Sequence, residues 1–133
     1  MWTSAIFDSV YSRIKANGTI ILKPTYSTIN FNDVTPSAEN IKYPCVVVKE
    51  LSGSETGMDF EGDVNGVWSP FQIEVLTNTK MRDARKIADV CFDLMNKMGY
   101  RAIGTPIPDE NIELNDYRVI ARYRRNVGSN DVL

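Results

Sequence analysis

The stretch WSPFQIEVLTNTKMRDARKIADVCFDLMNKMGY, residues 68 to 100, determines the fold class that we predict. In its first part Phe71, Ile73 and Val75 alternate with their neighbours, which is the pattern of a half-buried strand. Its second part repeats apolar residues at intervals of three and four, as amphipathic helices do. These residues are Met81, Ala84, Ile87, Ala88, Cys91, Met95 and Met98. We therefore predict a strand followed by a long helix, near residues 80 to 98, that lies across one sheet face.

The ends of this helix have recognisable signals. Thr77, Asn78 or Thr79 can act as the N-cap, because short polar side chains accept hydrogen bonds from the first helical N–H groups. Gly99 is the expected C-terminal stop.

The residues before Trp68 predict the other half of a hairpin. The segment YPCVVVKEL contains three consecutive β-branched valines, and we expect a strand at residues 45 to 51, paired with residues 67 to 76. Residues 52–66 between them hold four glycines and mostly polar residues, so we expect a protruding hairpin tip. Such a protrusion on a small domain often contacts another molecule.

The N-terminal segment WTSAIFDSVYSRIKANG predicts another helix. Its apolar face consists of Ile6, Phe7, Val10, Tyr11 and Ile14. We expect the helix to stop at Asn17 and Gly18 and the stretch TIILKP to be β-rich. Residues 25 to 42 should be mostly loop, with a short edge strand.

After the central helix, YRAIGTPIPDENIELNDYRVIARYRRNV predicts a strand, a proline-containing loop and a final strand. One face of the final strand should carry Tyr117, Val119, Ala121 and Tyr123, and the other Arg118, Ile120, Arg122 and Arg124. Residues 126–133 would form a short polar tail. The chain of 133 residues is thus predicted to be a single α+β domain with a mainly antiparallel sheet, a long hairpin and two helices.

The composition disfavours most enzyme classes. The chain has no histidine, which removes the usual general base and the commonest zinc ligand. Cys45 and Cys91 are expected to be reduced and buried. The net charge of −2 argues against a dedicated nucleic-acid binder, although it is compatible with a local basic patch. We find neither a membrane-spanning run nor a signal peptide, so we expect synthesis in the cytoplasm.

Specific catalytic and metal sites are not supported either. An acidic loop beginning at Asp59 has Val64 and Pro70 where a calcium loop needs glycine and a bidentate acid. The turn LTNTK lacks the glycine of a phosphate cradle, and Glu74 has no lysine two positions later, as a nuclease core would. No pair of carboxylates has a spacing that places it in one cleft. We expect no catalytic residue, no metal site and no cofactor.

A separation of charge remains. Residues 52 to 66 carry acids and no base, whereas residues 117 to 125 carry arginines and no acid. The acids are Glu55, Asp59, Glu61 and Asp63, and the arginines are Arg118, Arg122, Arg124 and Arg125. Three interpretations are open: two solvated surfaces, complementary patches that meet between copies of the chain, or arginines that contact DNA phosphates.

The order of these segments resembles a known family. An N-terminal helix, YPCVVV, a glycine-rich hairpin, FQIEVLTNT and KMRDARKIADVCFDLMNKMGY before a terminal strand are similar to the tail terminator, or tail completion, proteins of long-tailed bacteriophages. The resemblance covers roughly residues 44 to 123 and includes no catalytic signature. Residues 25 to 42 do not align to the family pattern.

The resemblance implies a structural virion protein without enzymatic activity. Members close the head-proximal end of the tail tube as a ring, usually of six copies, and dock to head-completion proteins. The implied partners are further copies of the chain, the tail tube protein, a head-completion or connector protein, and the end of the packaged DNA. The implied location is the tail and neck of a virion assembled in the host cytoplasm. Another neck protein, a tail-tube subunit, and a small binding module or enzyme with an unrecognised site are alternatives.

Overall fold

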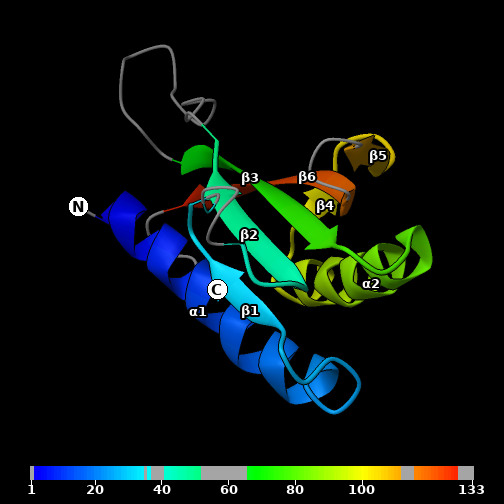
Figure 1. Cartoon of the computed structure of the whole chain (residues 1–133). Coiled ribbons are helices and arrows are strands. Elements are labelled where there is room, and N and C mark those ends of the chain that lie inside the picture. Colours follow the sequence, from blue (N-terminus) through cyan, green and yellow to red (C-terminus); the bar gives the residue numbers. More distant parts are fainter. Residues whose placement is uncertain (1, 35, 37–40, 52–65, 112–115, 129–133) are drawn as a thin grey trace.

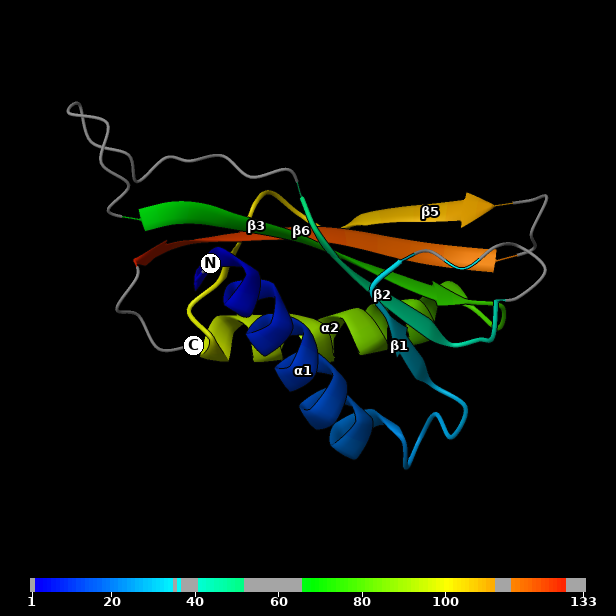
Figure 2. The same cartoon turned by 90° about the vertical axis from the view of Figure 1, so that its left-hand side faces the viewer.

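The computed structural model describes residues 2–34, 36, 41–51, 66–111 and 116–128 (Figure 1). They form two layers, a six-stranded sheet and a pair of helices that lie together on one of its faces (Figure 2). The helices are α1, Trp2–Leu22, and α2, Met81–Lys97. The predicted α+β fold is therefore confirmed.

The sheet has the strand order β1-β2-β3-β6-β4, and β5 also pairs with β6. The strands are β1 Asn30–Asn32, β2 Cys45–Glu50, β3 Gly66–Thr77, β4 Arg101–Ala102, β5 Ile107–Asn111 and β6 Asp116–Gly128. All pairs are antiparallel except β1 with β2. The pairing of β2 with β3 confirms the predicted strands of the hairpin, and β1 confirms a short edge strand.

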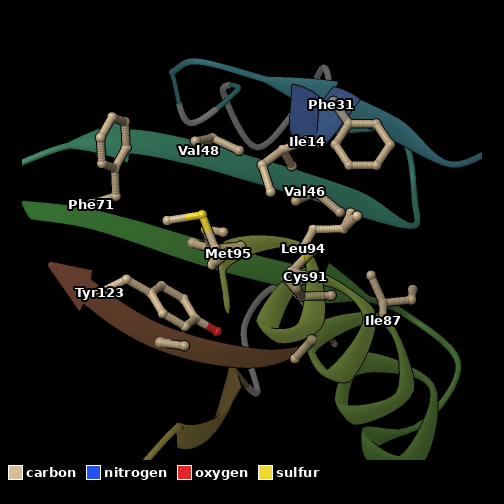
Figure 3. Close-up of a cluster of buried hydrophobic side chains, with 14 of the residues drawn as sticks. Ile14, Phe31, Val46, Val48, Phe71, Ile87, Cys91, Leu94, Met95 and Tyr123 are labelled. Carbon is tan, nitrogen blue, oxygen red and sulfur yellow. The ribbon is translucent and has the colours of Figure 1, made fainter. Parts of the chain in front are cut away.

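The main core lies between the helices and the sheet (Figure 3). Ile87, Cys91 and Met95 of α2 face Val46 and Val48 of β2 in this core, as their helical spacing predicts. Phe71, Ile73 and Val75 of β3 join them, together with Val119, Ala121 and Tyr123 of β6. Leu94, which the predicted repeat omits, is buried as well.

The first helix does not stop at Asn17 and Gly18, as we expected, but continues to Leu22. Gly18 lies in the buried stripe of α1 between Ile14 and Leu22, and a Cβ atom there would come 2.6 Å from Cζ of Phe31. Gly18 therefore serves to let α1 pack closely against β1, and it does not act as a helix stop. The stretch TIILKP is consequently helix and turn, and the expectation of a β-rich segment was wrong.

The start of α2 also differs from the prediction. Its N-cap residue is Lys80, which makes no side-chain capping bond. Thr79 Oγ1 instead donates a hydrogen bond to Asp83 Oδ2, and this bond is the main reason that the pKa of Asp83 is lowered. Tyr26 donates a second bond to Asp83, which ties the loop after α1 to α2.

The last helical residue of α2 is Lys97, and Gly99 stops the helix, as predicted. The N–H of Gly99 donates to Asn96 O at 2.9 Å, and the N–H of Tyr100 donates to Met95 O at 2.9 Å. This is the hydrogen-bond pattern of a Schellman motif, and the φ of 83° at Gly99 suits it. The turn directs Tyr100 back into the core, where it is fully buried.

The C-terminal part is more regular than we predicted. The proline-containing loop includes β5, which pairs with residues 116 to 120 of β6. The strand after α2, β4, has only two residues, and β6 extends through residues 126 to 128, which we expected in the tail. β5 was missed because two prolines flank or interrupt it and β6 supplies its only partner among the described strands.

Candidate interface on the open face of the sheet

We call the sheet face that is turned away from α1 and α2 the open face (Figure 2). Val119, Ala121 and Tyr123 of β6 are buried on the helix side, so Arg118, Ile120, Arg122 and Arg124 project from the open face. The predicted alternation of the final strand is thus confirmed for these residues. The four arginines nominated from sequence nevertheless have three different environments.

Arg118 belongs to a buried ion-pair network. Its guanidinium donates to Glu74 Oε1 at 3.0 Å and to Asp116 Oδ1 at 3.3 Å. The side chains of Arg118, Glu74 and Asp116 are 17%, 7% and 0% exposed. Burial lowers the pKa of Arg118, but the bonds and charges of Asp116 and Glu74 outweigh this effect and raise it above its usual value. Arg118 therefore stabilises the sheet and offers little surface for a partner.

A short segment before β2 covers the open face beside this network. Ile41 and Tyr43 pack on a small apolar cluster of Cys45, Val47 and Leu76. The hydroxyl of Tyr43 donates to Asp116 Oδ2 at 3.0 Å. Burial and then this bond raise the pKa of Tyr43 above its usual value. The β2 end of the open face is consequently closed over by the chain itself.

Arg125 points to the opposite side of β6 and binds the end of α2. It donates to the carbonyl of Met98 at 2.8 Å and lies against Gly99, where a Cβ atom would come 3.2 Å from Arg125 Nε. A cation at a helix C-terminus is stabilised by the carbonyl dipoles. This role in the fold separates Arg125 from the arginines of the open face.

Arg122 and Arg124 are exposed on the open face. Arg122 Nε donates to Gln72 Oε1 at 3.1 Å, which orients its guanidinium along the sheet. In register, Lys49 of β2 lies beside Gln72, and Arg101 of β4 lies opposite Arg124. Directly paired residues share a sheet face, so four cations gather there. We call Lys49, Arg101, Arg122 and Arg124 the basic patch.

Sequence reasoning missed two members of this patch. Lys49 and Arg101 are far from β6 along the chain, and only the strand order β2-β3-β6-β4 places them beside Arg122 and Arg124. The alternation of β2 gave a partial signal, because it predicts Lys49 on the face opposite Val46 and Val48. No local signal was available for Arg101.

A groove borders the patch where β4 meets β6. It has a volume of about 510 Å³, and its lining includes Gly99, Arg101, Gly104, Arg124 and Arg125. Within the part of the chain that the structure describes, no three potential metal ligands gather. Cys45 and Cys91 are buried free thiols, in agreement with the sequence interpretation. Because its lining includes three arginines, the groove between β4 and β6 is positively charged and suits an anion.

Glu55, Asp59, Glu61 and Asp63 lie outside the described residues, as does almost all of the expected hairpin tip. Of the arginines nominated from sequence, the structure brings Arg122 and Arg124 together, beside Lys49 and Arg101. It places Arg118 and Arg125 in separate internal contacts. Neither of the described helices is long and apolar enough to cross a membrane.

Comparison with known proteins reveals a shared fold. No protein-family model and no curated protein sequence matches this chain. Among solved structures, the chain is similar to one in a structure described as the virion of a native gene transfer agent particle. The match has a TM-score of 0.58 and 16% sequence identity, and it covers 90% of this chain and 91% of that chain. The likeness therefore extends over nearly the whole length of both chains.

Proposed function

We propose that this chain is a structural virion protein that closes the head-proximal end of a tail tube as a ring. The observation that carries the proposal is the fold shared, over nine tenths of both chains, with a chain from a virion structure. The resemblance of residues 44 to 123 to tail terminator proteins supports the more specific role. The protein would act by assembly, without catalysis and without a cofactor.

The proposed partners are further copies of the chain, in a ring of about six, with the tail tube protein on one side and a head-completion protein on the other. The basic patch supports self-assembly, because opposite charges at a contact between copies determine its orientation. Arg122 and Arg124 are the members nominated from sequence that remain exposed. We retain Glu55, Asp59, Glu61 and Asp63 as candidate acids for the other side of the contact.

Labelling of assembled particles tests the role. Antibody-coupled gold directed at this chain should mark one position, the junction of head and tail, in electron micrographs. Particles made without the chain should have unjoined heads and overlong tails, because a tube that is not closed continues to polymerise. Gold along the whole tail would instead indicate a tube subunit, and filled heads that leak DNA would indicate a head-completion protein. Either result would contradict the proposal.

A further inference from the structure

We infer that the exposed face of α2 binds the same face of a second copy, with the two helices antiparallel and related by a two-fold axis. The contact lies on the helix layer, on the other side of the sheet from the basic patch (Figure 2). It goes beyond the proposed ring, because a two-fold contact closes after two chains, whereas a ring is built from head-to-tail contacts.

A stripe of four charged residues runs along the outward side of α2. Its members are Arg82, Lys86, Asp89 and Asp93, spaced four, three and four residues apart. Residues at these intervals lie one above another on the same side of a helix. All four are exposed, whereas Ile87 of the same helix points into the core (Figure 3). We call these four residues the charge stripe; its first half is positive and its second half is negative.

The order of charges in the stripe does not favour the helix itself. Arg82 and Lys86 are four residues apart, as are Asp89 and Asp93, and like charges at this spacing destabilise a helix. Arg82 also lies in the first turn, where the helix dipole disfavours a cation. Within the described residues, no member of the stripe takes part in an ion pair. The stability of α2 therefore does not account for this order.

The stripe is complementary to itself when a second helix runs antiparallel. Arg82 then faces Asp93 of the second copy, and Lys86 faces Asp89 of the second copy. Both pairs have their midpoint between Ile87 and Ala88, so one two-fold axis through this point forms both of them at once. Each pair is made twice, once from each chain. A parallel pair in register would instead set like charges against each other.

An aromatic contact accompanies the charge pairs. Phe92 is 38% exposed, and its ring lies against that of Tyr123, with 6.3 Å between the centroids. Arg85 lies on the same flank of the stripe, two turns earlier, and in an antiparallel two-fold pair each flank meets the same flank of the other helix. Phe92 of one copy thus meets Arg85 of the other in a cation–π contact. A hollow of about 420 Å³, whose lining includes Met81, Arg85 and Asp89, lies beside this position.

The contact is small. α2 has 17 residues, so it is about 26 Å long. One helix against one helix falls in the class of interfaces below about 1,200 Å² in total, which is typical of transient complexes. Because exposed ion pairs are individually weak and screened by salt, the pair should form reversibly and dissociate at high ionic strength.

A half-reversed variant tests the charge pairs. Arg82→Glu with Lys86→Glu makes the whole stripe negative. In sedimentation velocity experiments, it should pair at least about tenfold more weakly than the wild type, whether the paired units are single chains or rings, because every facing pair becomes repulsive. Lys23→Glu with Lys42→Glu is the matched control, since it changes the net charge equally on exposed residues outside α2. The control should pair like the wild type.

An exchanged variant is the decisive measurement. Arg82→Asp, Lys86→Asp, Asp89→Lys and Asp93→Arg together keep the net charge and the self-complementarity of the stripe but reverse its order. This variant should recover wild-type pairing to within about threefold. Its melting temperature should not fall, because acids near the helix N-terminus suit the dipole. Mixed with the wild type, it should form no mixed pairs. An exchanged variant that pairs no better than the half-reversed one would overturn the inference.

A disulfide cross-link tests the register. A chain with Lys86→Cys, mixed with a chain with Asp89→Cys, should form a mixed disulfide at least about tenfold faster than Lys23→Cys does with Asp89→Cys, because only the first two positions face each other. The native Cys45 and Cys91 are buried and should not compete. Denaturing gels detect this product whether the chains are free or in a ring. Equal rates for the two mixtures would contradict the register.

A different occupant would also overturn the inference. If the half-reversed variant pairs like the wild type but loses salt-sensitive binding to duplex DNA, the positive half of the stripe binds phosphates. None of these measurements depends on gold labelling. The contact through α2 can therefore fail while the chain still marks the junction of head and tail, and the reverse result is equally recognisable.

Discussion

Gly18 shows how one residue determines the packing of α1 on the sheet. It occupies the position between Ile14 and Leu22 in the buried stripe of the helix, and the ring of Phe31 fills the space where a side chain would be. Tyr11 of the same helix donates a hydrogen bond to the carbonyl of Phe31 at 3.0 Å. The glycine therefore allows a close approach of helix and strand, and helix propensity alone would favour alanine there.

Replacement of Gly18 by alanine should destabilise the protein despite the better helix propensity of alanine. The new Cβ would lie 2.6 Å from Phe31 Cζ, and overpacking of this kind costs about 1 to 3 kcal/mol. Urea unfolding would measure the loss. Phe31→Leu in the Gly18→Ala background should recover part of it, so the two changes should not be additive. A Gly18→Ala variant more stable than the wild type would refute this packing role.

Cys91 provides a second prediction, about pH. Complete burial raises the pKa of its thiol from 9.0 to about 12. Because the folded state holds this proton more tightly, the stability contributed by the neutral thiol is complete below pH 9 and is lost as the pH rises toward 12. Between pH 9 and pH 10 the loss should be about 1 kcal/mol.

A Cys91→Ala variant isolates this contribution. Burial followed by the neighbouring Cys91 also raises the pKa of Tyr123, and its titration acts in the same direction. The difference between wild type and variant should therefore shrink between pH 9 and pH 10 in denaturant titrations. A difference that stays constant over this range would contradict the assignment.

Strand β6 shows how one element can carry both a buried structural charge and an exposed charge. Arg118 and Arg122 are four residues apart and share the open face, yet Arg118 is enclosed by Glu74 and Asp116 while Arg122 lies exposed beside Gln72. Their different burial follows from the segment before β2, because Tyr43 covers Asp116 at one end of the strand. Position along β6 therefore decides which arginine can meet a partner.

Matched substitutions on β6 should have different effects. Arg118→Ala removes the cation that forms ion pairs with two buried carboxylates, Glu74 and Asp116, and breaking a buried pair in this way costs about 3 kcal/mol or more. Arg122→Ala should change the free energy of unfolding by no more than about 0.5 kcal/mol. Thermal and urea unfolding of both variants measure the contrast. Equal losses of unfolding free energy in the two variants would show that the buried ion pairs of Arg118 stabilise the fold no more than the exposed Arg122 does.

In the part of the chain that the structure describes, both helices lie on one face of the sheet, and the other face carries no helix (Figure 2). The buried side supplies the core, whereas the open face and β5 carry exposed charges of both signs. A small domain with this division can join others while its own core stays intact. Assembly and folding should consequently respond differently to solution conditions.

Salt separates the two processes. Raising the ionic strength from about 0.1 to 1 M shortens the screening length from about 10 to 3 Å, so contacts between exposed charges should weaken strongly. We expect assemblies to dissociate over this range in light-scattering measurements. The unfolding midpoint of the subunit should change little, because its ion pairs are buried and less screened. Assemblies that persist or grow in high salt would indicate an apolar contact instead.

The sequence by itself determined the parts of the protein that depend on local periodicity. Alternation in β3 and β6 and the three-and-four spacing in α2 identify which side of each element is buried, because that side must face the core in any compact arrangement. The stop at Gly99 was predictable from a local signal as well, because the residue after a helix often adopts a left-handed conformation, which favours glycine. These patterns were sufficient for the α+β class.

Only the tertiary structure decided features that depend on partners distant in the chain. Gly18 continues a helix because Phe31 packs against it, and β5 is a strand because β6 provides its hydrogen bonds. The candidate site divides in the same way. The sequence identified Arg122 and Arg124 as members of the basic patch, and the strand order shows that Lys49 and Arg101 belong to it as well. Arg118 and Arg125 do not belong to the patch, because Arg118 pairs with Glu74 and Arg125 binds the end of α2. Local sequence specifies which side chains face out, whereas their neighbours on that face depend on how the strands are ordered.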